Sequence, residues 1–205
     1  MTRTDKNVAC RSKREAIIRA AVTEFQKSGY VETSMDRISE TANVSKRTVY
    51  NHFPSKEALF EAILKELVER SGQLELSAPR TDEDLEKQLL VVAHQYAQMM
   101  TSDDFIKLAR VVLSRFIQSP HLVGAAITGK EPQQPIEDWF TAAQKTGLMP
   151  EFDSEQAATE FTGVITATEF WPKLISNEGL TDPGARDLYL KSMVCMFLGH
   201  YASRG

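Results

Sequence analysis

The segment from Ser45 to Phe53 combines hydrogen-bonding side chains with two apolar residues at helical spacing. Val49 and Phe53 stand four residues apart, so a helix would turn both toward the same side. Its other side would carry cationic, hydroxyl, amide and imidazole groups, which bind phosphates and base edges: Lys46, Arg47, Thr48, Tyr50, Asn51 and His52. This pattern favours recognition of nucleic acid by a short helix.

Helix start and stop signals place this segment third in a series of helices. Ser45 is a good helix N-cap, and Pro54 disfavours helix at the residue before it. Upstream, Thr33 or Ser34 caps a shorter helix, and a longer first helix ends at Gly29. We therefore predict three helices in this region, the third of them ending just before the proline.

The second and third helices are predicted to form a helix-turn-helix, which needs a tight turn and small apolar contacts. Asn43 can adopt the left-handed backbone conformation of such a turn at lower cost than most residues. Ile38 and Ala42 on the second helix and Val49 on the third supply contacts that would lock the pair. The polar side of the third helix would then stay free to bind.

The two parts of the chain carry opposite net charges, although the formal net charge of the whole is -4. Residues 1–56 hold 11 Lys and Arg against 6 Asp and Glu, a net charge of +5, which leaves -9 for residues 57–205. A basic segment suits an acidic partner such as DNA. Several basic side chains near the N-terminus would lie against phosphates or in a minor groove, or else belong to a disordered tail: Arg3, Lys6, Arg11, Lys13 and Arg14.

Other classes of protein find no support in the sequence. No run approaches the roughly 18 uncharged apolar residues of a membrane helix, and the polar, basic first residues do not form a secretory signal. No histidine has a glutamate three residues before it, and no metalloprotease, phosphate-loop or serine-hydrolase motif is present. Cys10 and Cys195 match no metal or redox spacing, and Cys195 is expected to be buried. We therefore expect no catalytic residue, no cofactor, no metal, no membrane partner and a cytoplasmic location.

Residues 12–70 resemble the DNA-binding head of the TetR family of transcriptional regulators, above all in the stretch GYVETSMDRISETANVSKRTVYNHFPSKEALF. The resemblance is carried by the aromatic residue after the first helix and by a set of characteristic positions beyond it: Ile38, Ala42, Val44, Ser45, Val49, Tyr50, His52, Phe53, Lys56, Leu59 and Phe60. Asn43 stands where the family usually has glycine, and its tolerance of the left-handed conformation accounts for this departure.

The resemblance implies contacts with DNA for the matching residues. The start of the third helix matches contacts to bases or nearby phosphates, at Lys46, Arg47 and Thr48. Phosphate contacts are implied around it, at Thr33, Ser34, Tyr50, His52 and Lys56. Ser45 and Asn51 complete the predicted DNA-binding set. In the alternative interpretation Tyr50 and His52 pack and cap locally, and the lysines and Arg47 form a solvated basic face.

Past residue 80 the chain is similar to the AefR-like branch of C-terminal domains, over residues 103–171. This similarity implies a homodimer paired through the last two long helices, predicted at 155–172 and 183–202. One recognition helix reads too few base pairs for specificity, whereas a twofold dimer presents two about 34–36 Å apart. Each of these helices has an apolar stripe that is expected to pair with the other chain; in the alternative interpretation the stripes are core of a single chain. The residues are Phe161, Val164, Thr168, Trp171, Leu190, Met193, Phe197 and Tyr201.

The same similarity implies a small-molecule effector inside the C-terminal part. Polar groups among apolar ones are the candidates to orient it, namely His94, Arg110, Arg115 and Glu169. Large apolar side chains would form the walls: Tyr96, Met99, Met100, Phe116, Trp139, Phe140, Phe161 and Phe170. The mixture suits a largely apolar or amphipathic molecule, although such residues at helical spacing are also typical of an ordinary core.

The predicted fold class is all-α, with a three-helix helix-turn-helix head, a helical-bundle regulatory domain and about nine helices. We predict a basic flexible arm at 1–11, a DNA-binding domain at 12–56, a connecting helix at 57–77, and a ligand-binding and dimerisation domain at 78–205. The predicted function is that of a repressor released from a pseudo-palindromic double-stranded DNA operator by its effector. The alternative is an effector-independent activator or architectural DNA-binding protein, and an enzyme is the remotest interpretation.

Overall fold

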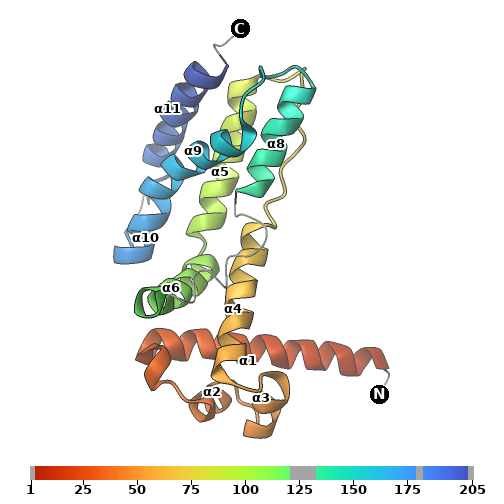
Figure 1. Ribbon diagram of the computed structural model, residues 1–205, viewed down its shortest axis with the longest axis vertical. Coiled ribbons are helices and arrows are strands. Elements are labelled where there is room, and N and C mark those ends of the chain that lie inside the picture. The colour runs from red at the N-terminus through yellow and green to blue at the C-terminus, as the bar shows by residue number, and fades with distance from the viewer. Residues whose placement is uncertain (1–2, 121–132, 179–181, 203–205) are drawn as a thin grey trace. The chain divides into compact units, whose positions relative to one another are not determined.

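The computed structural model describes residues 3–120, 133–178 and 182–202, with side chains from residue 12 onward. Within these ranges every regular element is a helix (Figure 1), so the predicted all-α class is confirmed. The chain divides into two compact units, which we call the head and the body. The head contains the described residues of 1–67 and 107–128, and the body those of 68–106 and 129–205.

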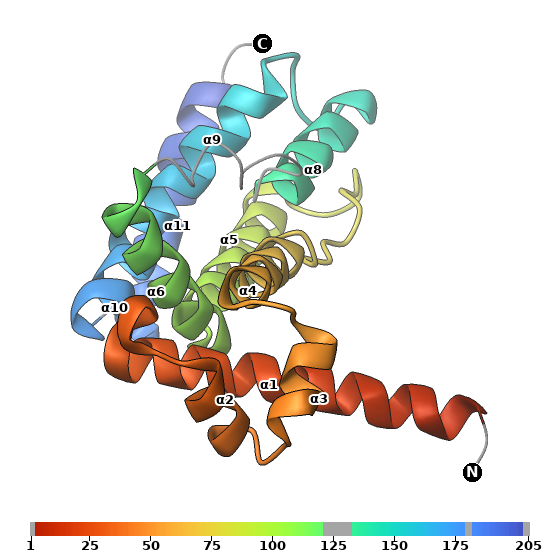
Figure 2. The same cartoon turned by 60° about the horizontal axis from the view of Figure 1, so that its bottom comes forward.

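The head is built from α1 (Arg3–Glu32), α2 (Met35–Thr41), α3 (Lys46–His52), the first part of α4 (Lys56–Ser71) and the later part of α6 (Asp103–Gln118). Figure 2 shows α2 and α3 side by side against α1. One apolar core joins these helices, with Ile17, Ile38, Val49, Leu59 and Ile63 fully buried in it. The helix α1 includes residues 3–11, the stretch for which the sequence predicts a flexible arm.

The later part of α6 belongs to this core, which the sequence did not predict. Leu108, Val111 and Val112 are buried among the side chains of α1 and α4, and the Phe116 ring meets the Phe60 ring edge to face. These apolar positions recur every three to four residues, so one face of α6 packs into the core of the head. A helix distant in sequence thus completes the core that supports α2 and α3.

The body is a bundle of α5 (Leu85–Thr101), α8 (Gln134–Lys145), α9 (Ser154–Ile165), η2 (Thr166–Phe170), α10 (Trp171–Ser176) and α11 (Pro183–Tyr201). The helix α5 buries one side against the bundle, at Leu89, Val92, Ala93, Tyr96, Ala97 and Met100. An aromatic cluster joins α8, α9 and α11, where the Phe140 ring stacks on Phe197 and meets Phe161 edge to face. Ring pairs of this kind add to the stability gained by burial alone.

The helices α9, η2 and α10 follow one another without a break, and η2 is a single π-helical stretch within them. The side chain of Asp153 caps α9 by accepting a hydrogen bond from the Gln156 amide at 3.0 Å. Glu160 near the start of this run accepts a hydrogen bond from Tyr201, whereas Glu169 near its end pairs with Arg186. The run therefore lies antiparallel to α11.

Candidate nucleic-acid interface

The helix α3 has the boundaries that the sequence predicts. Ser45 caps it by accepting a hydrogen bond from the Thr48 amide at 3.1 Å, and the Phe53 amide closes the last turn on the Val49 carbonyl at 2.8 Å. Val49 and Phe53 are buried in the core of the head. Because both anchors lie on the inward side, the helix is fixed and its polar side faces outward.

The turn before α3 depends on Asn43. Its φ of 52° lies in the left-handed region, as predicted. The Asn43 amide donates to the Glu40 carbonyl, and the Val44 amide donates to the Ser39 carbonyl. The turn is thus held by backbone hydrogen bonds, and asparagine replaces glycine in it at modest cost.

The outward side of α3 collects the side chains predicted to meet DNA. Lys46, Arg47, Tyr50 and Asn51 are exposed, and His52 is half-buried. Half of the large Tyr50 side chain is exposed although its immediate neighbour in sequence, Val49, is fully buried. A helix of seven residues bearing these groups has the dimensions to enter the major groove and the donors to bind there.

Lys46 forms an ion pair with α2. Its Nζ lies 2.6 Å from Asp36 Oδ2, and both side chains are more than half exposed. The hydrogen bond to Asp36, followed by the charge of that carboxylate, raises the pKa of Lys46. A contact between Lys46 and DNA would therefore compete with this pair.

Ser34 and Thr33 at the start of α2 have different surroundings. Ser34 is exposed and caps α2 by accepting a hydrogen bond from the Arg37 amide at 3.2 Å. Thr33 is buried, and its hydroxyl lies at hydrogen-bond distance from the carbonyls of Glu24 and Gly29. The Thr33 side chain therefore holds the turn between α1 and α2 rather than facing outward.

Lys56 at the start of α4 is bound within the head. Its Nζ donates to the carbonyls of Tyr30, Val31 and Thr33 at 2.8, 3.0 and 2.9 Å. An ammonium group has three N–H donors, and these three carbonyls account for all of them. A hydrogen bond from Lys56 to a phosphate would replace one of these internal bonds.

Glu24 is a residue of the head that the sequence analysis did not identify. Glu24 is buried on α1, accepts a hydrogen bond from Thr41 at 2.8 Å and lies 3.2 Å from the Arg37 guanidinium, so it fastens α2 to α1. A signal was present, because Glu24 stands among the apolar residues that form the buried side of α1. Arg14, predicted as part of the basic arm, lies over the Phe53 ring at 5.3 Å.

The predicted effector residues are divided between the body and the head, and they differ in burial. Tyr96, Met100, Phe140, Phe161, Glu169 and Phe170 are buried in the body, and His94 and Met99 are half-buried there. Burial raises the pKa of Tyr96 to about 12, so its hydroxyl is neutral. His94 Nε2 lies 3.2 Å from Asp187 on α11. Arg110, Arg115 and Phe116 belong to the head.

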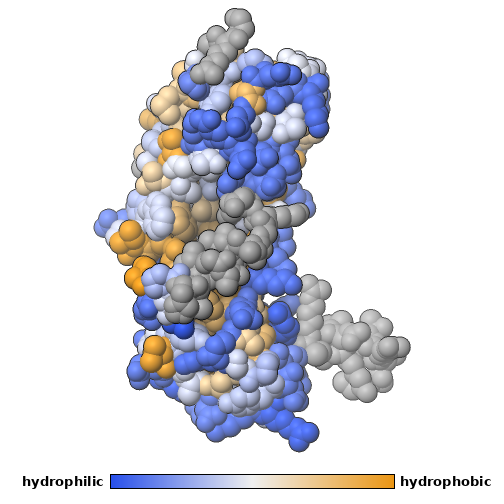
Figure 3. All heavy atoms as spheres, in the orientation of Figure 1, coloured by the Kyte–Doolittle hydropathy of each residue, from blue (hydrophilic) through white to orange (hydrophobic). Residues whose placement is uncertain are grey.

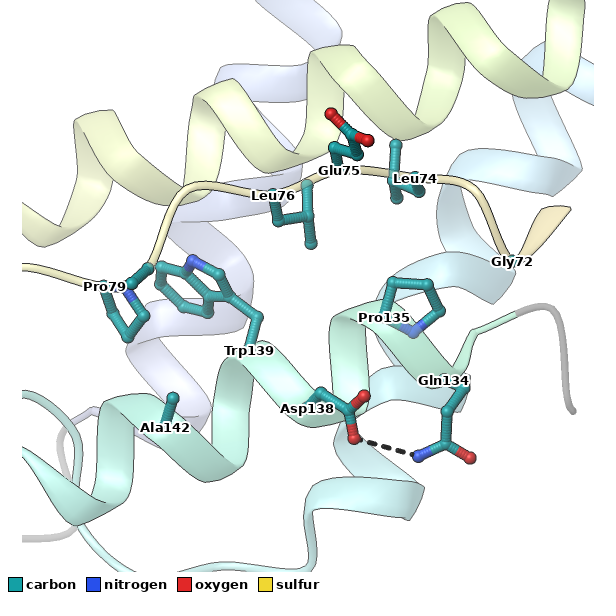
Figure 4. A pocket seen from close by; sticks show the side chains of 11 residues that line it. Gly72, Leu74, Glu75, Leu76, Pro79, Gln134, Pro135, Asp138, Trp139 and Ala142 are labelled. Carbon is teal, nitrogen blue, oxygen red and sulfur yellow. Dashed lines mark hydrogen bonds between the residues drawn. The ribbon is translucent and has the colours of Figure 1, made fainter. Parts of the chain in front are cut away.

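A groove of about 450 Å³ runs along the body between residues 72–79 and α8 (Figure 4). Its apolar lining includes Leu74, Leu76 and Pro135, and Asp138 adds a carboxylate. Trp139 is the predicted effector residue that contributes to it, and its indole Nε1 donates to the Ser77 carbonyl at 3.0 Å. This bond holds the extended segment against α8.

Comparison with known proteins decides the family. Residues 17–63 match the profile described as "Bacterial regulatory proteins, tetR family". Residues 87–203, more than half of the chain, match "AefR-like transcriptional repressor, C-terminal domain". The chain belongs to the TetR family. This is a family of DNA-binding transcriptional regulators with a helix-turn-helix, not a family of enzymes.

Individual TetR-family proteins are similar over most of the chain. A TetR family transcriptional regulator from Pseudomonas syringae pv. tomato str. DC3000 is 37% identical, with a TM-score of 0.77 over 93% of this chain and 97% of that one. The flavonoid-responsive regulator FrrA is 25% identical, with a TM-score of 0.70 over 94% of this chain and 98% of FrrA. The curated relative RutR of Escherichia coli (strain K12) is 39% identical over 61 residues, or 29% of its length. The chain therefore matches less than a third of that curated relative.

The helices of this TetR-family protein that were predicted to pair turn their predicted stripes inward. Five of those residues are buried within the single chain: Phe161, Leu190, Met193, Phe197 and Tyr201. Val164 and Thr168 are half-buried, and Trp171 is 46% exposed. The large apolar side chains exposed on the other side of the same helices are Ile175, Leu188 and Met196, at 78%, 70% and 62%. Cys195 is also exposed there, so its predicted burial was wrong.

None of the described helices is both long enough and apolar enough to cross a membrane. In the same residues, no three side chains of His, Cys, Asp or Glu come together as metal ligands would.

Proposed function

We propose that this TetR-family regulator is a ligand-responsive repressor that binds a pseudo-palindromic DNA operator as a homodimer. The observation that carries the proposal is the outward side of α3, where Arg47, Tyr50 and Asn51 are exposed on a helix anchored by Val49 and Phe53. The C-terminal profile is described as that of a transcriptional repressor, which supports repression rather than activation.

The exposed groups of α3 suggest a division of roles at the operator. Arg47 and Asn51 stand one turn apart, and their side chains are the types that bind guanine and adenine edges with two hydrogen bonds. Tyr50 and His52 would donate to phosphates, as would Ser34 beside the start of α2. Asp36 would keep Lys46 from phosphates in most wild-type complexes, and Thr48 lies beside the capping Ser45, their hydroxyls 2.8 Å apart.

The dimer is proposed to form through the outward side of α9 to α11. In Figure 3 orange apolar surface covers the region that α10 occupies in Figure 1. Trp171 and Ile175 on α10 and Leu188 and Met196 on α11 are exposed on antiparallel neighbours. Exposed apolar side chains this large on adjacent helices are typical of a protein interface. This surface replaces the inward stripes as the proposed contact.

An effector is proposed to bind in the body and to favour a state of the dimer with lower affinity for the operator. Two findings support this step. The body contains a groove with a mixed apolar and polar lining, and FrrA, which is similar over 98% of its length, is described as flavonoid-responsive. A largely apolar small molecule suits such a lining.

The test is selection of bound fragments from genomic DNA, followed by titration of the selected duplex at several salt concentrations. We expect sequence-preferring, salt-sensitive binding of two chains per palindrome. Compounds that raise the melting temperature are then added to the complex, and at least one should release the DNA. Binding without any sequence preference would overturn the proposal. Operator binding that no stabilising compound affects would favour an effector-independent activator or architectural protein.

Asp36→Asn should tighten binding to all DNA sequences and steepen its salt dependence. The substitution removes a carboxylate beside the proposed contact surface and frees the Lys46 ammonium, 2.6 Å from it, for a phosphate. One added lysine contact changes the slope of log K against log salt by about -0.9. Fluorescence anisotropy with operator and random duplexes measures both effects. Asp36→Glu keeps the carboxylate and should behave as wild type, and an equal slope in Asp36→Asn would mean that Lys46 does not reach a phosphate.

A further inference from the structure

The Tyr30 ring at the end of α1 is in contact with two cations. Lys56 Nζ lies 4.6 Å from the ring centroid, and the Arg115 guanidinium carbon lies 4.4 Å from it. Both distances are within the range of a cation–π interaction. Lys56 comes from α4 and Arg115 from the late part of α6, so this buried ring joins three helices of the head.

The ring and Lys56 together hold the turn that starts α2. The Tyr30 hydroxyl donates to Glu57 Oε1 at 3.1 Å, while Lys56 binds the carbonyls of Tyr30, Val31 and Thr33. Burial, followed by the nearby Glu57 charge, raises the pKa of Tyr30 to about 12, so the hydroxyl remains a donor. The next residue, Ser34, is the N-cap of α2. The position of α2, and through its contacts that of α3, follows from this turn.

Arg115 is held in place from the side of α6. Leu108, Val111 and Val112 fix α6 in the core of the head, and the Arg115 guanidinium also donates to the Ser119 hydroxyl. The side chain is half-buried, which strengthens its interaction with the ring relative to an exposed pair. Neither Arg115 nor Tyr30 belongs to the outward side of α3.

We propose that Arg115 is a positioning residue for operator binding, which acts through the Tyr30 ring and Lys56 on the turn between α1 and α2. The inference rests on the proposed DNA-binding function and adds to it a determinant outside the recognition helix. Without the guanidinium, the head samples turn geometries in which α2 and α3 are misplaced. Apparent affinity falls in proportion to the fraction of molecules in the binding geometry.

The test compares Arg115→Met, Arg115→Lys and the matched control Lys107→Met in the full-length chain. Lys107 is an exposed cation on the same helix, so its loss removes the same charge without touching Tyr30. We expect Arg115→Met to weaken binding to the selected operator by about 3- to 30-fold, the range of one cation–π contact. Arg115→Lys should recover most of this loss, and Lys107→Met should stay within about twofold of wild type.

The salt dependence separates positioning from direct contact. Arg115→Met should leave the slope of log K against log salt equal to that of Lys107→Met, because no phosphate contact is lost. A smaller slope than the control would show that Arg115 binds DNA itself and would overturn the proposal. So would a loss no larger than that of Lys107→Met, or a failure of Arg115→Lys to recover affinity.

Two further variants keep the test decisive if Arg115→Met lowers the melting temperature of the head. Arg115→Gln keeps a polar side chain without the cation and should show the same loss. In a double-mutant cycle with Tyr30→Leu, removing the cation should cost little once the ring is absent; additive losses would overturn the proposal. If the wild-type protein binds no DNA selectively, the proposed DNA-binding function is wrong. If the wild type binds selectively but the variant affinities do not follow the expected order, only the role of Arg115 is wrong.

Discussion

Arg186→Met should lower the free energy of unfolding by about 3–5 kcal/mol, the usual cost of breaking a buried ion pair by removing one partner. Arg186 of α11 binds the Glu169 carboxylate through three contacts, from Nε at 3.0 and 3.1 Å and from a terminal nitrogen at 2.7 Å. Glu169 is 0% exposed in the π-helical stretch η2. Methionine would leave this carboxylate buried without its counter-charge. Urea unfolding followed by circular dichroism measures the loss.

The double variant Glu169→Met/Arg186→Met provides the control for this prediction. It removes both charges and fills the same space, so most of the lost stability should return, because isolated buried charge and not lost packing causes the defect. A double variant as unstable as Arg186→Met would mean that the π-helical stretch depends on the carboxylate itself. Operator affinity, measured below the unfolding transition, should change little in the double variant, since both residues lie in the body.

The head could be predicted in detail because its signals are local. Ser45 and Ser34 cap the helices that follow them, Asn43 adopts the left-handed turn, and Val49 and Phe53 lie inward. Each of these features depends on residues within about one helical turn, so neighbouring residues in the sequence are enough to determine the local conformation.

Partners distant in sequence could not be predicted in the same way. The residues around Lys56 in the sequence give no sign that its side chain is bound within the protein. Its three N–H groups nevertheless bind carbonyls 23 to 26 residues earlier. Thr33 is buried against Glu24, and Arg115 reaches the Tyr30 ring across 85 positions of sequence. Only the packing of α1, α4 and α6 shows that these residues hold one another.

The orientation of α11 illustrates a different limit. Leu190, Met193 and Phe197 form an apolar stripe, and so do Leu188, Cys195 and Met196 on the other side. A helix that is apolar around most of its circumference has no periodicity that distinguishes core from interface. The sequence favoured the stripe with the larger side chains as the pairing surface. The structure buries that stripe within one chain and leaves the other exposed.

Met196→Glu should convert the proposed dimer into monomers and weaken operator binding by at least about 100-fold. The Met196 side chain is 62% exposed in the single chain, so glutamate there is solvated and should leave the melting temperature of the monomer nearly unchanged. In a twofold dimer each substitution occurs twice, and a pair of unpaired carboxylates at an apolar contact is strongly unfavourable. Operator binding then loses the second recognition helix, whose tethering contributes about 10²- to 10⁴-fold.

Analytical ultracentrifugation and operator titration of the same samples check the two parts of this prediction together. Gln98→Glu adds the same charge at an exposed position of α5, and should sediment and bind DNA as wild type does. A Met196→Glu protein that remains dimeric would place the interface elsewhere. A monomeric variant that still binds the palindrome with wild-type affinity would show that pairing is not what makes binding tight. The expected result, loss of dimer and of affinity at unchanged monomer stability, arises only if the outward side of α11 is a contact between chains, because a core position would lose stability as well.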